Sequence, residues 1–276
     1  MRFKGAEEPE LEGGVQYHVR VSPREAERYA LLPGDPDRVL KIASQWDEAV
    51  EVSRHREYLV YRGRYKGVGL MAVSTGIGGP AAGIAVEELS RVGVDTFIRV
   101  GSTGAIQPGI EVGDLVISLA AVRLDGTSRQ YVGLEYPAYA HPEVVMALIE
   151  AAETLGYRYH VGVTASTDSF YTGQGRRGYG GYWQSWMENI VRDLARARVL
   201  NFEMEAATIF TLSSLFGKRA GAVCAVFAQR VTGEFDVRGE EEAARVANEA
   251  VKILSEWDSI KEREGKEVFY PGLLRR

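Results

Sequence analysis

Arginine, glycine and hydroxyl residues gather at points where apolar strands are expected to end. One such segment is 99–104, R-V-G-S-T-G, which places the guanidinium of Arg99 beside two hydroxyls and two glycines. One bidentate cation with neutral donors around it is suited to a phosphate group. An arginine paired with an internal carboxylate is the alternative, because an unpaired buried cation is costly.

A second segment, 33–38 (P-G-D-P-D-R), joins an expected strand to an expected helix. Gly34 allows close backbone approach, and the amides at a helix start attract anions. Asp35 can cap a helix that begins at Pro36. Arg38 falls in the first turn, where the helix dipole disfavours a cation, and that cost indicates a nearby anion. The alternative is a solvated Arg38 on a capped helix.

A third segment, 74–81 (S-T-G-I-G-G-P-A), contains the looser form of the dinucleotide-binding fingerprint. The acidic residue that should bind the ribose would be Asp95. It lies at the start of its expected strand, whereas a ribose-binding acid follows the strand. We therefore favour tight packing of a strand against a helix over a dinucleotide site.

Two carboxylates, Glu203 and Glu205, occupy an expected strand-to-helix junction. At most one need face a pocket, where it could accept hydrogen bonds from a vicinal diol. Compensation of the helix dipole would explain both equally well.

An aromatic ring, an amide and a guanidinium occur together in segment 170–176, F-Y-T-G-Q-G-R. Phe170, Gln174 and Arg176 could stack on a planar ring and read its donors and acceptors. Arg230 follows the apolar run 220–228 and is expected nearby. Segment 177–186 is rich in glycine and aromatic residues, which fits either a lid or an oligomer contact.

The elements that must position these residues alternate along the chain. Strands are expected at 29–32, 48–52, 57–65, 68–74, 96–100, 114–122, 161–166 and 220–228. Helices are expected from Pro36 and at 80–92, 142–155, 203–216 and 240–257. This alternation predicts one three-layer α/β domain covering residues 1–276. Residues 1–15 are expected to be a flexible N-terminal extension.

Composition excludes several classes of protein. The 276 residues include 45% hydrophobic and 26% charged residues and carry a net charge of −5, which argues against a bulk nucleic-acid or membrane binder. One cysteine, Cys224, excludes an intrachain disulfide framework and a multi-cysteine zinc site. The acidic N-terminus has no apolar signal segment, so a cytoplasmic location is expected. The P-loop and nucleophile-elbow motifs are absent, and the four histidines lack metal-ligand spacing.

Taken in order, these segments resemble the class-one nucleoside phosphorylase family, and most closely its uridine-cleaving branch. The resemblance spans about residues 16–255 and rests on 33–39, 53–58 (S-R-H-R-E-Y), 74–80, 99–108, 122–126 (V-R-L-D-G), 162–166, 170–176 and 201–206. It implies a mixed central sheet between helical layers. It also implies reversible phosphorolysis, in which uridine and phosphate give uracil and ribose 1-phosphate in pyrimidine salvage or catabolism.

The resemblance assigns a role to individual residues. Phosphate would be bound by Gly34, Arg38, Arg99, Ser102 and, from a neighbouring subunit, Arg56. Ribose would be held by Met204, Glu205 and the neighbour's His18. The base would contact Thr103, Gly104, Phe170, Gln174, Arg176, Phe202 and Arg230. Arg99, Arg176 and Glu205 are the expected catalytic residues.

Some family features are altered in this sequence. Ser102 stands where threonine is usual, and Phe227 and Ala228 replace aliphatic residues beside the base. Relatives that cleave purines place an acid near this strand, whereas 226–230 (V-F-A-Q-R) has none. Ala81 replaces a hydroxyl residue that helps some relatives bind a monovalent cation such as K⁺ between subunits, although Glu57 is kept. No metal or organic cofactor is expected, and phosphate is a co-substrate.

Because Arg56 and His18 would serve a neighbouring site, the resemblance implies a dimer as the functional unit within a hexamer. Three alternatives stay open: a purine nucleoside phosphorylase, a hydrolytic nucleosidase and a non-catalytic nucleoside-binding protein. The last two need no phosphate site, so Arg38, Arg56 and Arg99 argue against them.

Overall fold

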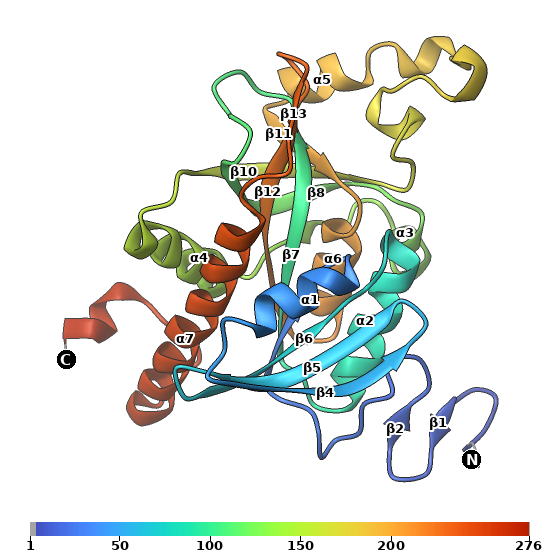
Figure 1. Ribbon diagram of the computed structural model, residues 1–276. Coiled ribbons are helices and arrows are strands. Elements are labelled where there is room, and N and C mark those ends of the chain that lie inside the picture. Colours follow the sequence, from blue (N-terminus) through green and yellow to red (C-terminus); the bar gives the residue numbers. More distant parts are fainter. Residues whose placement is uncertain (1–3, 276) are drawn as a thin grey trace.

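The computed structural model describes residues 4–275 (Figure 1). One eleven-stranded mixed sheet dominates the molecule, and a two-stranded hairpin, β1 (Glu10–Leu11) and β2 (Val15–Gln16), precedes it. The large sheet consists of β3 (Tyr29–Leu32), β4 (Glu48–His55), β5 (Tyr58–Tyr65), β6 (Val68–Val73), β7 (Thr96–Ala105), β8 (Leu115–Leu124), β9 (Ala138–Tyr139), β10 (Tyr159–Thr167), β11 (Val199–Glu203), β12 (Arg219–Gln229) and β13 (Glu234–Phe235).

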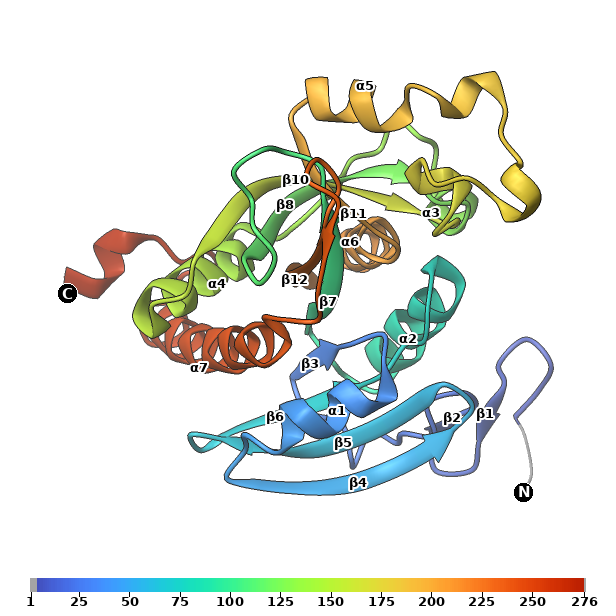
Figure 2. The ribbon, with the colours of Figure 1, turned by 45° about the horizontal axis from the view of Figure 1, so that its top comes forward.

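Helices cover both faces of this sheet, as the predicted three-layer α/β domain requires. The helices are α1 (Pro36–Ala43), α2 (Gly79–Arg91), α3 (Thr127–Tyr131), α4 (Pro142–Leu155), α5 (Ile190–Arg196), α6 (Ala206–Leu215) and α7 (Glu240–Glu264). In one layer α4 and α1 pack against α7, and in the other α2 and α3 pack against α6. Figure 2 shows α7 and α4 on one side of β7 and β12, with α6 and α2 on the other.

Half of the sheet closes on itself. β12 pairs in parallel with β7 and antiparallel with β8, and the chain of pairings β8–β10–β11–β7 completes a ring of five strands. The other half, β3–β6–β5–β4, extends from β7 as an open sheet. β7 therefore belongs to both halves, and residues on it can face elements from each.

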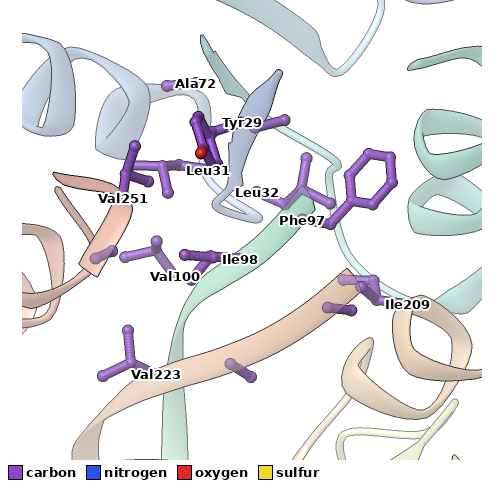
Figure 3. Close-up of a cluster of buried hydrophobic side chains, with 14 of the residues drawn as sticks. Tyr29, Leu31, Leu32, Ala72, Phe97, Ile98, Val100, Ile209, Val223 and Val251 are labelled. Atoms are coloured by element: carbon purple, nitrogen blue, oxygen red, sulfur yellow. The ribbon is translucent and has the colours of Figure 1, made fainter. Parts of the chain in front are cut away.

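The core lies between the sheet and its two helical layers. Leu31, Phe97, Val100 and Val223 are fully buried and come from three neighbouring strands (Figure 3). β12 is almost continuously apolar, as expected of a strand covered on both faces.

The predicted helix boundaries agree best with the structure where the sequence contains recognisable capping residues. α4 begins at Pro142 and ends before Gly156, which adopts the left-handed conformation at φ 73°. His141 caps this helix by accepting a hydrogen bond from the amide of Glu143.

Two predicted boundaries of strands and helices were wrong, and both lie in segments that carry candidate site residues. The strand expected at 96–100 continues through Gly101–Gly104 to Ala105, so this segment is not a loop. The helix expected from Glu203 begins at Ala206, because residues 199–203 form β11, a strand that was not predicted. Helices α3 and α5 were also missed, since both are too short to show clear periodicity.

The expected N-terminal extension, residues 1–15, includes most of the hairpin β1–β2, in which Glu10 pairs with Gln16 and Leu11 with Val15, while residues 1–3 lie outside the described part of the chain. The flexibility of this segment stays a prediction. Across residues 4–275, no helix is long and apolar enough to cross a membrane.

A buried ion cluster joins β12 to α7. The guanidinium of Arg219 donates two 2.8 Å hydrogen bonds to Asp258, which also accepts a 2.6 Å hydrogen bond from the hydroxyl of Tyr29. Burial alone would raise the pKa of Asp258, but the bonds from Arg219 and Tyr29 outweigh it and lower this pKa to about 2.

We expect Asp258→Asn to lower the free energy of unfolding by about 3 kcal/mol near pH 7, because it removes one partner of a buried ion pair. The folded pKa lies below the unfolded value, so the stabilisation is present above about pH 4 and is lost as the pH falls through about 2. Denaturant unfolding at fixed protomer concentration measures it. The control Asp236→Asn removes an exposed ion pair with Arg238 and should cost below about 1 kcal/mol. An Asp258→Asn deficit that persists unchanged at about pH 2 would contradict this assignment.

Candidate active site

A cavity of about 630 Å³ opens where β7, β11 and β12 meet the loops that follow β3, β6 and β10. Predicted site residues from segments 33–38, 99–104, 170–176 and 201–206 line it: Gly34, Arg38, Arg99, Ser102, Thr103, Gly104, Phe170, Gln174, Arg176, Phe202, Met204 and Glu205. The cavity thus brings together side chains that are far apart in the sequence. Their individual roles stay predictions.

Arg99 lies within β7, with its side chain almost fully buried. Its Nε donates to Glu203 at 2.7 Å, and its Nη2 lies 2.5 Å from Glu205. The internal ion pair considered as an alternative therefore exists. Arg99 also lines the cavity, so the two interpretations are compatible.

The two carboxylates at the start of α6 differ in what they contact. Glu203 accepts hydrogen bonds from the amides of Glu205 and Ala206 at 2.8 and 2.9 Å, and another from the Ser166 hydroxyl. It therefore supplies the partners that the first amides of a helix lack. Glu203 also borders the cavity, although its oxygens are already committed to these donors.

Glu205 accepts a 2.5 Å hydrogen bond from the amide of Gly78 and pairs with Arg99. Burial, supported by the nearby charge of Glu203, raises the pKa of Glu205 above its ordinary value despite the opposing effect of Arg99. Each oxygen of Glu205 has one such partner, and its remaining lone pair can accept a hydrogen bond from a ligand hydroxyl.

Arg38 is buried, so the interpretation as a solvated side chain was wrong. Asp35 caps α1 as predicted, by accepting a hydrogen bond from the amide of Asp37 at 2.9 Å. The anion beside Arg38 is a protein group, Glu240, which accepts a 2.7 Å hydrogen bond from Nε. The sequence did show acidic residues in the first turn of the last helix, α7. It gave no indication that one of them pairs with Arg38, which is distant in the sequence.

The glycines of the loops after β3 and β6 are needed for close approach. A Cβ atom at Gly34 would lie 2.9 Å from the carbonyl oxygen of Gly76, and one at Gly79 would lie 2.6 Å from the Thr208 hydroxyl. Gly79 therefore permits close packing, but of α2 against α6, whereas the favoured interpretation of segment 74–81 was a strand packed against a helix. Asp95 pairs with Arg28 and Arg219, away from the cavity.

The amide and guanidinium lie at the other end of the cavity: a Cβ atom at Gly104 would lie 3.8 Å from Arg176 Nη2, whereas Arg38 donates to the carbonyl of Val100, four residues earlier in β7. Arg176 Nη1 donates to Gln174 Oε1 at 2.7 Å and to the carbonyl of Phe170 at 2.6 Å, and the guanidinium lies 4.1 Å from the Phe170 ring centre. Burial, with the charge of Arg230, lowers the pKa of Arg176 to about 10, which keeps it protonated near neutral pH. This end therefore presents a fixed cation beside an aromatic ring.

Arg230 is not among the described residues that line the cavity. It donates to the carbonyls of Gln174 and Gly175 at 2.9 and 3.3 Å, and so supports the loop that carries Gln174. Phe227 and Ala228, which the resemblance placed beside the base, also line the cavity. Ile77 and Phe235 line it too, and neither was predicted. Ile77 and Phe235 are exposed, which is unusual for such side chains and was not visible in the sequence.

Two predicted residues, His18 and Arg56, lie outside the lining of this chain's own cavity as far as residues 4–275 define it. The ring nitrogen Nδ1 of His18 lies 2.6 Å from Glu88, and the Arg56 guanidinium lies 6.0 Å from the ring of Tyr17. The expectation that they serve a neighbouring subunit stays a prediction.

Within the described residues, no group of three or more His, Cys, Asp or Glu side chains could hold a metal ion. Beside half-buried Glu57, Ala81 has no side-chain oxygen to offer a monovalent cation. The donors present on this chain therefore fit such a cation poorly.

The mixed sheet, its helical layers and a cavity with cations at both ends define a phosphorylase-type protein. The chain belongs to the phosphorylase superfamily, whose family model matches residues 28–256. It is 64% identical over 272 residues to uridine phosphorylase of Thermococcus kodakarensis, covering 99% of this chain and 98% of that protein.

Two other relatives are named for different nucleosides. Uridine phosphorylase of Escherichia coli is 45% identical over 82% of this chain and 89% of its own. Guanosine phosphorylase of Halorubrum lacusprofundi is 42% identical over 79% of this chain and 85% of its own. A similar degree of sequence identity is therefore shared with relatives that are named for different nucleosides.

Proposed function

We propose that this protein is an enzyme that cleaves uridine by reversible phosphorolysis, giving uracil and ribose 1-phosphate. The observation that carries the proposal is the cavity itself, with Arg38 and Arg99 at one end and the Gln174–Arg176 pair at the other. The identity of 64% over nearly the whole of a uridine phosphorylase supports it.

The choice of base rests on the Gln174–Arg176 end. Gln174 can both donate to and accept from a base edge, and Arg176 supplies a positive charge. Segment 226–230 carries no acid that could protonate a purine ring. These features favour a pyrimidine over a purine, although a guanosine phosphorylase lies within the same range of identity.

The reaction transfers ribose from nitrogen to oxygen. A phosphate oxygen forms a bond to C1′ as the C1′–N1 bond breaks, and the electron pair of that bond leaves with uracil. Arg38, Arg99 and Ser102 would hold the phosphate, while Glu205 and Met204 would hold the ribose. Arg176 would stabilise the negative charge that develops on the carbonyl oxygens of the departing base.

The test follows uridine by ultraviolet absorbance with and without inorganic phosphate, with inosine as the comparison substrate. Phosphate-dependent release of uracil and ribose 1-phosphate supports the proposal. Uridine cleavage that needs no phosphate would indicate a nucleosidase, and cleavage of inosine alone would indicate a purine enzyme.

We further propose that two subunits complete each other's sites, within a hexamer, through Arg56 and His18. Inorganic phosphate is the co-substrate, and no organic cofactor takes part. No step requires a cation at Glu57. A single buried cysteine fits the reducing cytoplasm, where we place the enzyme.

Subunit exchange tests the shared site. Arg56→Ala and Arg176→Ala should each be nearly inactive alone, but a mixed dimer would contain one site with both arginines intact. Random mixing should therefore restore about a quarter of wild-type activity, because half of the dimers are mixed and each has one intact site. A mixture no more active than its components would contradict a shared site.

A further inference from the structure

Glu240 lies in the first turn of α7 and differs from its neighbours in that turn. Its side chain is 11% exposed, whereas that of Glu241 is 66% exposed. Acidic residues are favoured at any helix start by the dipole, and an exposed glutamate would serve that purpose. The burial of Glu240 therefore needs a further explanation.

The contacts of Glu240 explain its burial. Its Oε1 accepts the 2.7 Å hydrogen bond from Arg38 Nε, and its Oε2 pairs with Lys41 Nζ. Arg38 also donates from Nη1 to the carbonyl of Val100 at 3.2 Å. The planar guanidinium is thus held at two of its three nitrogens. Nη2 makes no hydrogen bond to any residue in the described part of the chain, and Arg38 lines the cavity.

We propose that Glu240 is a positioning residue for phosphate: it fixes the guanidinium of Arg38 so that Nη2 is presented to the anion. This inference rests on the proposed function. Because Glu240 already holds the Arg38 side chain in one conformation, phosphate binding loses less side-chain conformational entropy.

The charges around Glu240 are arranged so that it does not oppose phosphate binding. Arg38 and Lys41 carry two positive charges against one negative charge, so the group stays cationic. Burial would raise the pKa of Glu240, but hydrogen bonds from Lys41 and Arg38 outweigh it and keep this pKa below its ordinary value. Glu240 is therefore ionised at neutral pH.

The experiment compares Glu240→Ala and Glu240→Gln with the matched control Glu241→Ala. We expect Glu240→Ala to raise the KM for phosphate about tenfold, as is typical of residues in one hydrogen-bond network. Glu240→Gln keeps an acceptor for Nε and should fall between wild type and Glu240→Ala. The KM for uridine, and kcat at saturating phosphate, should stay within about twofold in all three variants.

A second arm uses Arg38→Gln as the background. If Glu240 acts through Arg38, adding Glu240→Ala to Arg38→Gln should change the KM for phosphate little further. An unchanged or lowered KM for phosphate in Glu240→Ala, or the same rise in the control, would overturn the inference while leaving phosphorolysis intact. Wild-type enzyme without phosphate-dependent cleavage would instead overturn the proposed function.

Discussion

Arg99→Lys is expected to lower kcat/KM for phosphate by about 10²–10³. Arg99 contacts Glu203 through Nε and Glu205 through Nη2, and it borders the cavity from the middle of β7. A lysine keeps the positive charge but offers one ammonium group in place of a planar fork, so it cannot serve both carboxylates and a phosphate together. Initial rates of uracil release at varied phosphate and saturating uridine measure the change.

Lysine is preferred to alanine here because Arg99 also balances two buried carboxylates. Arg99→Ala would leave Glu203 and Glu205 without a cation and should cost roughly 3–5 kcal/mol of stability. Thermal unfolding of both variants separates the two effects: Arg99→Lys should remain folded when its activity is lost. A folded Arg99→Lys enzyme with a normal phosphate dependence would remove Arg99 from the phosphate site.

The residues of the candidate site could be predicted from the sequence where local motifs carry them. Their contacts with residues distant in the sequence could not. Gly34, Arg38, Gln174 and Arg176 were found because their loops carry recognisable combinations of residues. The partner of Arg38, by contrast, is 202 positions away in the sequence. Whether a buried arginine pairs with protein or ligand is decided by such distant neighbours, which no local pattern specifies.

The same limit explains the misplaced elements. The segment 101–104 contains two glycines and two hydroxyl residues, which favour a turn when taken alone. It remains strand because β12 pairs with it along one edge and β11 joins it at Gly104. Tertiary pairing therefore overrides local propensity where the sheet closes, which is also where the cavity forms.

Arg176→Ala should lower kcat for uridine by about 10²–10³ while changing the KM for phosphate little, because Arg176 lies near Gly104 and Arg38 contacts Val100, four residues earlier in β7. Its guanidinium is fixed by Gln174 and Phe170 before substrate arrives, so it can stabilise charge on the leaving base without reorganising. The exposed neighbour Arg177 provides the control, and Arg177→Ala should behave like wild type.

A substrate series makes this assignment of Arg176 sharper. Fluorine at C5 of uracil withdraws electrons, so the base departs with less need for external charge stabilisation. If Arg176 acts on the leaving group, Arg176→Ala should lose much less activity on 5-fluorouridine than on uridine. Equal losses on both nucleosides, measured at saturating phosphate, would show that Arg176 binds the base without assisting its departure. Since Arg176 is cationic in the folded enzyme up to about pH 10, the wild-type advantage on uridine should persist across the neutral range and decline only above that pH.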